Sequence, residues 1–196
     1  MKHIFKNKNN DKTLILLHGT GGDENSLISL AEKIDSSANL LGLRGRIDEN
    51  GKARFFKREN NTYDLKSLEE ETKQLYETII SLSEKYQINL NNVTFIGFSN
   101  GANILVSLIQ YYPNQFKKFA LLSPDYVNEE KRFQTINQTK VFISSSREDE
   151  FVDFDNVDKL IFDLKVKKAD VELHLSSGHK IDNNVLNSLK EWYLNN

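Results

Sequence analysis

Ser99 has the sequence surroundings of a nucleophile that transfers acyl groups. It stands in Gly97-Phe98-Ser99-Asn100-Gly101, which fits the pattern Gly-x-Ser-x-Gly. An apolar run over 93–96 precedes it and an apolar-periodic stretch over 104–109 follows it, which predicts a strand, a sharp turn and a helix. Such a turn exposes the serine hydroxyl to a base that takes its proton, and glycines flank it because a Cβ there would crowd strand against helix. The alternative interpretation is a chance match in an ordinary loop.

A base for this serine must be a histidine, and the chain has four. His3 precedes the expected core, and His174 lies within an expected strand. His18 adjoins a glycine turn and is expected to hold that turn. His179 follows a strand in the loop Ser176-Ser177-Gly178-His179, so we predict that His179 is the base.

The acid that orients the histidine should lie between serine and histidine in chain order, on a loop after a strand. Residues 145–150, Ser-Ser-Arg-Glu-Asp-Glu, form such a loop. Asp149 is our choice of acid, with Glu148 and Asp153 as alternatives. Arg147 is expected to be a surface charge. The other interpretation of this acidic cluster is a solvated loop without a catalytic role.

A glycine-rich turn, His18-Gly19-Thr20-Gly21-Gly22, follows the first apolar run of the chain. Backbone N–H groups in such a turn can face a negative charge. Phosphate binding is one interpretation, but the turn lacks the ending of a P-loop and the spacing of a dinucleotide fingerprint. We favour an oxyanion hole made by the backbone N–H groups of Thr20 and Asn100. A plain glycine-rich helix entry is the remaining possibility.

The stretch 46–63 is polar and contains Arg54-Phe55-Phe56. Adjacent phenylalanines in such a loop usually pack locally, but they can also line an apolar substrate pocket. Phe55 and Phe56 are therefore candidate pocket residues, with local packing as the alternative.

The elements that must position these residues alternate between strands and helices. The expected strands are 13–17, 39–45, 93–96, 119–123, 141–144 and 171–175, and the expected helices are 26–37, 65–86 (capped by Asp64), an elbow helix ending near Pro113, 157–166 and 183–194. This order predicts an α/β fold with a mostly parallel sheet and helices on both faces. Active sites of such sheets gather at the carboxyl ends of the strands, where all the candidate loops lie.

The composition of the chain limits the classes of protein to which it can belong. The chain has 196 residues, 38% hydrophobic and 28% charged, which suits one globular domain over 1–196. A net charge of −2 gives no electrostatic case for nucleic acid or an anionic membrane. Without cysteine, disulfides, a thiol nucleophile and a thiolate metal site are excluded. No signal peptide or membrane span is recognisable, so we expect a cytoplasmic protein.

Taken together, these motifs resemble the phospholipase/carboxylesterase group of α/β-hydrolases, the small cap-less branch that includes acyl-protein thioesterases. Within it, the chain is most similar to bacterial carboxylesterases of the MhqD type. The stretches that carry the resemblance are 17–24, Arg44-Gly45, 49–51, 54–56, 97–101, Asp149 and Gly178-His179.

The resemblance implies a triad of Ser99, Asp149 and His179 with an oxyanion hole at Thr20 and Asn100. It implies no metal or organic cofactor, no lid domain, a small-molecule ester or thioester substrate, and a monomer or homodimer. The edge strands that precede the core in larger hydrolases are expected to be missing. The alternatives are a low-turnover ligand-binding protein on the same fold, and a lactonase or peptidase using the same triad.

Overall fold

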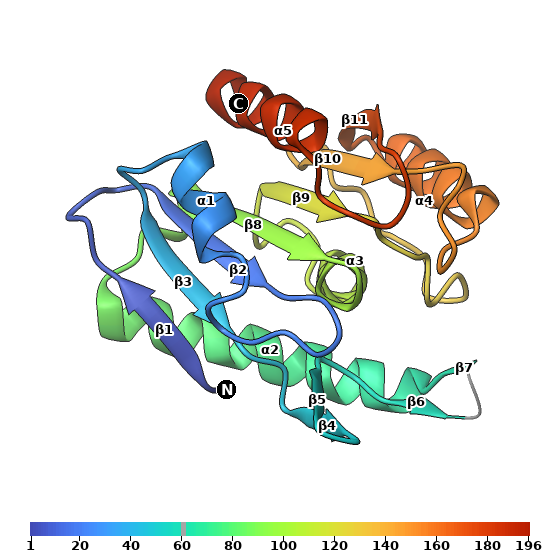
Figure 1. Cartoon of the computed structure of the whole chain (residues 1–196), viewed down its shortest axis with the longest axis horizontal. Helices are drawn as coiled ribbons and strands as arrows, with labels where there is room; N and C mark the ends of the chain where they lie inside the picture. Colours follow the sequence, from blue (N-terminus) through green and yellow to red (C-terminus); the bar gives the residue numbers. More distant parts are fainter. Residues whose placement is uncertain (60–61) are drawn as a thin grey trace.

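A seven-stranded sheet forms the centre of the protein in a computed structural model that describes residues 1–59 and 62–196 (Figure 1). Its strand order is β1-β3-β2-β8-β9-β10-β11, and every neighbouring pair is parallel except β1 and β3. The strands are β1 (His3–Lys6), β2 (Thr13–Leu17), β3 (Asn39–Leu43), β8 (Val93–Phe98), β9 (Lys118–Leu122), β10 (Lys140–Ser145) and β11 (Asp170–Leu175).

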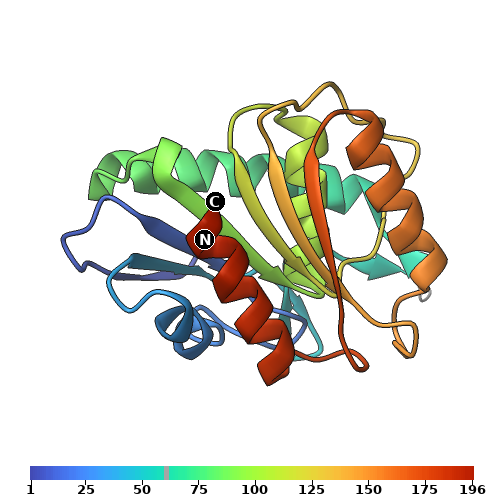
Figure 2. The same cartoon turned by 90° about the horizontal axis from the view of Figure 1, so that it is seen from above.

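Helices cover both faces of this sheet (Figures 1 and 2). Helices α2 (Leu65–Tyr86), α3 (Asn100–Tyr111) and α4 (Phe154–Val166) pack into one core. Helices α1 (Ile28–Ile34) and α5 (Asn183–Asn195) pack into a second core on the opposite face. This is the mostly parallel sheet with helices on both faces that the sequence predicts, and it fits the α/β-hydrolase fold that the resemblance implies.

Strand β2 shows how the sequence produces these two cores. All five of its residues are buried, as expected of a strand covered on both faces. Because side chains alternate along a strand, Ile15 and Leu17 enter one core while Leu14 and Leu16 enter the other. A run of apolar residues without alternation therefore marks the centre of the sheet.

The predicted helices agree with the structure to different degrees. Helix α2 has the predicted bounds, and the side chain of Asp64 accepts a hydrogen bond from the Ser67 N–H at 2.9 Å. The helix expected over 26–37 is shorter, since only Ile28–Ile34 is helical. No helix in the described part of the chain is long and apolar enough to span a membrane.

Two expectations need correction. An edge strand does precede the core: β1 pairs antiparallel with β3, from His3 opposite Leu43 to Lys6 opposite Leu40. The stretch 46–63, expected to be a loop, carries two small hairpins. They pair β4 (Ile47–Glu49) with β5 (Lys52–Arg54), and β6 (Arg58–Glu59) with β7 (Thr62–Tyr63).

Candidate active site

Ser99 occupies a strained turn between β8 and α3. Its φ of 52° and ψ of −117° lie outside the regions that non-glycine residues ordinarily adopt. The surroundings hold the turn, because the Ser99 N–H donates to the Leu122 carbonyl at 2.8 Å. A Cβ on Gly97 would stand 2.5 Å from the Gly101 carbonyl oxygen, and one on Gly101 would stand 2.2 Å from that of Leu17. Both glycines are required for the strand and helix to approach this closely.

His179 lies in the loop after β11 and pairs with Asp149 in the loop after β10. His179 Nδ1 is 2.7 Å from Asp149 Oδ2, and the side chains are 13% and 0% exposed. The other carboxylate oxygen accepts the backbone N–H groups of Phe151 at 2.8 Å and Val152 at 3.1 Å. The buried carboxylate is thus fixed by three hydrogen bonds and orients the imidazole with Nδ1 toward itself.

The loops that carry these two residues are joined to each other. Ser146 Oγ accepts the backbone N–H of Gly178 at 2.9 Å and that of Glu148 at 3.0 Å. Gly178 has a φ of 72°, in the left-handed region that favours glycine. The hydroxyl of Ser146 therefore sets the position of His179 relative to Asp149.

The two alternative candidates for the acid, Asp153 and Glu148, do not pair with His179 among the described residues. Asp153 caps α4, where its side chain accepts the Asp155 N–H at 3.0 Å. Glu148 is exposed and forms no contact with His179 among the described residues. Arg147 is also exposed, and its guanidinium lies 4.3 Å from the centre of the Phe154 ring.

His18 holds the glycine turn, as the sequence predicts. Only 1% exposed, it donates from Nδ1 to the Gly19 carbonyl at 2.6 Å and accepts the Gly45 N–H at Nε2 at 3.1 Å. Burial lowers the pKa of His18 below its ordinary value, and the hydrogen bond to Gly19 opposes this only in part. His18 is therefore a neutral residue with both ring nitrogens occupied.

A pocket of about 390 Å³ opens above the strained turn. Ser99, His179, Thr20 and Asn100 all line it. The backbone N–H groups of Thr20 and Asn100 donate to no acceptor among residues 1–59 and 62–196. Phe98 and Phe151 also line the pocket, with ring centres 5.2 Å and 5.1 Å from that of His179.

Phe55 and Phe56 do not line this pocket, which corrects their assignment as candidate pocket residues. Both are fully buried in the core. The Phe55 ring packs against His18 at 4.9 Å, and the Phe56 ring packs against Tyr63 at 5.7 Å. The Phe55 N–H donates to Asn100 Oδ1 at 2.7 Å, so this segment supports the turn after Ser99 from behind.

Several pocket residues were missed at the level of sequence, namely Lys52, Arg54, Arg58, Tyr63, Asn103 and Phe151. Most of them belong to the small hairpins of residues 46–63, whose strands are too short and polar to predict. The clustering of basic residues in that stretch was the available signal. No group of three or more His, Asp or Glu side chains in the described part of the chain is arranged to hold a metal ion.

Comparisons with known proteins show the family of the chain. Residues 54–195 match the phospholipase/carboxylesterase family. MhqD of Bacillus subtilis (strain 168), which carries the name of a hydrolase, is 35% identical over 98% of each chain. A carboxylesterase from Bacillus cereus superposes with a TM-score of 0.95 at 35% identity, covering 100% of this chain and 94% of that one.

A third similar protein is YahD, whose structure with malic acid superposes with a TM-score of 0.92 at 31% identity. The match covers 99% of this chain and 98% of YahD. The family match covers residues 54–195, and the similar proteins align over nearly the whole chain. The chain therefore belongs to the phospholipase/carboxylesterase family of α/β-hydrolases and is an esterase-type enzyme.

Proposed function

We propose that the enzyme cleaves carboxylic esters or thioesters of small to medium size through an acyl-enzyme on Ser99. The observation that carries this proposal is the shared pocket: a strained, half-buried serine and a histidine already paired with a buried carboxylate line the same space of about 390 Å³. This is the constellation of a nucleophile, a base and a group that orients the base.

In the proposed mechanism, Ser99 Oγ attacks the ester carbonyl carbon while His179 Nε2 takes the hydroxyl proton. The imidazolium that forms donates from Nδ1 to Asp149, which stays ionised. His179 then protonates the leaving alcohol or thiol. A water molecule, deprotonated by His179, attacks the acyl carbon; the bond from that carbon to Ser99 Oγ then breaks, His179 returns the proton to Ser99 Oγ, and the acid leaves.

Ser99 and His179 share no hydrogen bond among the described residues in this structure. Such contacts are often long in free enzymes and shorten when substrate binds. We therefore assign the base from its pairing with Asp149 and its place in the pocket.

The oxyanion formed at each step needs donors fixed before the reaction. The backbone N–H groups of Thr20 and Asn100 suit this role because both line the pocket and both lack an acceptor within the described chain. Removing one such donor typically costs about 10²–10³ in kcat. The hold of His18 on the glycine turn keeps the Thr20 donor in place.

Labelling with a fluorophosphonate probe, followed by matched ester and thioester panels, tests the proposal. Labelling and turnover should be present in the wild type and absent in Ser99→Ala. Ser81→Ala, on the exposed face of α2, is the control for loss of a serine hydroxyl and should retain both.

Folded Ser99→Ala with wild-type turnover would contradict the nucleophile assignment. Labelling of the wild type without turnover of any ester or thioester would favour the low-turnover binding protein instead. Turnover confined to cyclic esters or amides would favour a lactonase or peptidase.

A further inference from the structure

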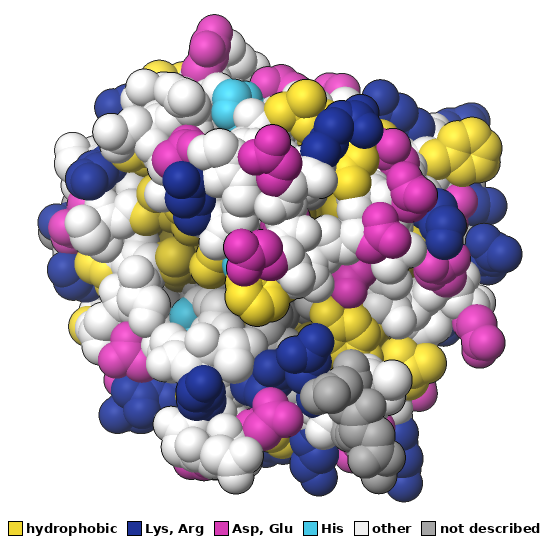
Figure 3. Space-filling view, turned by 45° about the vertical axis from the view of Figure 1, so that its right-hand side comes forward, with side chains coloured by type: hydrophobic (Ala, Val, Ile, Leu, Met, Phe, Trp, Pro, Cys, Tyr) yellow, Lys and Arg dark blue, Asp and Glu magenta, His cyan; other side chains and the backbone are white. Residues whose placement is uncertain are grey.

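The charge on the pocket wall is strongly one-sided. Lys52, Arg54 and Arg58 all line the pocket that contains Ser99, and no Asp or Glu is among its described lining residues. Figure 3, in which the carboxyl edge of the sheet is turned forward, shows basic side chains (dark blue) gathered beside a recess. The chain as a whole carries a net charge of −2, so this wall is locally distinct.

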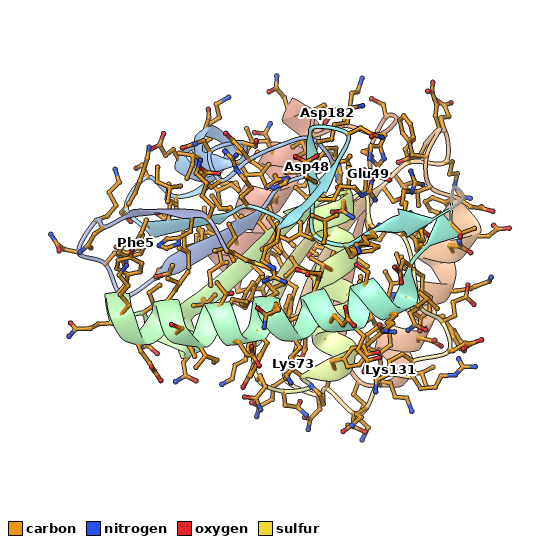
Figure 4. All side chains as sticks on the ribbon, turned by 90° about the horizontal axis from the view of Figure 1, so that it is seen from below. Phe5, Asp48, Glu49, Lys73, Lys131 and Asp182 are labelled. Carbon is orange, nitrogen blue, oxygen red and sulfur yellow. The ribbon has the colours of Figure 1, made fainter. Side chains whose placement is uncertain are left out.

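Arg54 is the inner member of this group. It is 4% exposed, and its Nη1 donates to Thr20 Oγ1 at 3.0 Å while Nε donates to the Phe56 carbonyl at 3.2 Å. Its carboxylate partner is Glu49, 3.1 Å from Nε. Figure 4 shows Glu49 beside Asp48 on the β4–β5 hairpin, and neither residue lines the pocket. Nη2 of Arg54 has no hydrogen-bond acceptor among the described residues, and Arg54 lines the pocket.

The other two cations have no carboxylate partner among the described side chains. The Lys52 stem lies over the glycine turn, where a Cβ on Gly21 would be 3.7 Å from Lys52 Cγ. The Arg58 guanidinium lies 5.2 Å from the centre of the Tyr63 ring. Among the described side chains, three cations stand against the single carboxylate of Glu49, which gives this part of the wall an excess of positive charge.

Tyr63 and Asp125 do not cancel this excess. Burial, together with Asp125, raises the pKa of Tyr63 to about 12, so the phenol stays neutral. Its hydroxyl donates to one oxygen of Asp125 at 2.9 Å, and Asn156 donates to the other at 3.3 Å. Asp125 is 8% exposed and stands behind Tyr63, outside the lining of this pocket.

The strand that carries Lys52 and Arg54 is tied to the reaction centre. The Gly21 N–H donates to the Ala53 carbonyl at 2.9 Å, and the Phe55 N–H donates to the side chain of Asn100, the residue after Ser99. These bonds fix β5 against both loops that bear the proposed oxyanion donors. A group bound by β5 is therefore held at a defined place relative to Ser99.

We propose that Lys52, Arg54 and Arg58 form a subsite for an anionic group of the substrate, so that the ester cleaved at Ser99 carries a carboxylate on its acyl or alcohol part. The inference rests on the proposed function of the same pocket. A fixed guanidinium binds a carboxylate through charge-assisted hydrogen bonds, and the neighbouring cations raise the local concentration of anionic substrate.

Matched ester pairs test the subsite. In the acyl series, methyl half-esters of succinate and glutarate are compared with methyl esters in which an isopropyl group replaces the carboxylate. In the alcohol series, butanoyl glycolate is compared with its isopropyl counterpart. We expect kcat/KM to favour the charged member of at least one series by about 10-fold or more at low salt, and the preference to shrink between about 20 mM and 500 mM NaCl.

Variants that each remove one positive charge test which residues cause the preference for charged esters. Lys52→Gln and Arg58→Gln should each lower the charged-to-neutral ratio of kcat/KM by about 3- to 10-fold. Lys57→Gln is the matched control, since Lys57 is exposed on the same segment but does not line the pocket. It removes the same charge and should leave the ratio unchanged.

The outcomes separate this inference from the proposed function. Equal turnover of charged and neutral esters in both series, abolished by Ser99→Ala, would overturn the subsite and leave the esterase mechanism standing. An equal fall of the ratio in Lys57→Gln would also overturn it, because the effect would then be general electrostatics. If no ester is turned over, the proposed function fails, and calorimetric titration of glutarate into Ser99→Ala, with and without Lys52→Gln, decides whether the anion subsite exists.

Discussion

Two histidines at the carboxyl edge of the sheet show how similar local geometry leads to different chemistry. His18 follows β2 and His179 follows β11, and in each the Nδ1 atom lies within 2.7 Å of an oxygen. In His18 that oxygen is a neutral carbonyl, and Nε2 is occupied by the Gly45 N–H. In His179 it is a carboxylate, and Nε2 has no acceptor or donor among the described residues.

The two histidines differ in the surroundings that a second ring proton would have. A proton on His18 would break the bond from Gly45 and place a charge in a buried site, and burial already lowers its pKa. A proton on His179 would be balanced by Asp149 across the 2.7 Å contact. We infer that a histidine becomes a base when its second nitrogen is left free and its first faces a fixed negative charge.

The largest expected effect is on His179→Ala. Loss of the base should lower kcat by about 10⁶, comparable to loss of the nucleophile, because the two residues act as a unit. Steady-state kinetics and fluorophosphonate labelling measure this. His174→Ala is the control, since His174 stacks on Phe142 within the sheet, and it should retain most activity. A dead His174→Ala beside an active His179→Ala would reverse the assignment of the base.

Asp149→Asn removes the feature that distinguishes His179 from His18. The amide can no longer stabilise the imidazolium and favours the wrong tautomer, so kcat should fall by about 10⁴ with a small change in KM. Asp153→Asn and Glu148→Gln remove carboxylates from the same loop and should be mild. A near-wild-type kcat in Asp149→Asn would mean that another group orients His179.

Substitutions of the aromatic neighbours of the two histidines should also have different effects. Phe55 packs on His18 and is fully buried, whereas Phe151 packs on His179 and is 70% exposed. Phe55→Ala should lower the free energy of unfolding by about 3–5 kcal/mol. Phe151→Ala should leave the unfolding midpoint in urea nearly unchanged and alter KM. Equal losses of stability in the two variants would contradict the burial difference.

Much of the fold could be predicted because the central strands are continuous apolar runs that end in glycine, serine or histidine. The edge strand β1 escaped prediction because its four residues are all half-buried and show no alternation. The short strands of residues 46–63 escaped prediction because each has only two or three residues, most of them polar. Such elements form through pairing with distant partners, which no local pattern records.

The part of the candidate site that could be predicted is the part set by the order of strands and loops along the chain. The loops of Ser99, Asp149 and His179 follow β8, β10 and β11, which are parallel strands of one sheet, and therefore lie at the same edge. Phe55 was misplaced because its burial depends on contacts with His18 and Asn100, both far away in the sequence. Arg54 was not predicted as a pocket residue because a charged residue in a loop is usually solvated, whereas this one is buried and donates to Thr20 Oγ1. The extent of the domain, 1–196, stays a prediction.

The smallest expected effect is a pH dependence of stability that belongs to His18. Because burial lowers the pKa of His18 in the folded state, the unfolded chain takes up this proton first as the pH falls below the ordinary value of about 6.5. The contribution of neutral His18 is therefore fully present above about pH 6.5 and is lost as the pH falls toward its folded-state pKa. In His18→Gln, whose amide can still accept the Gly45 N–H, this part of the acid destabilisation should disappear. Urea unfolding at several pH values from about 7.5 to 5 measures the difference between the two proteins, which cancels the contributions of the other histidines. Parallel pH profiles would show that folding does not lower the pKa of His18, and the contrast between His18 and His179 would then rest on Asp149 alone.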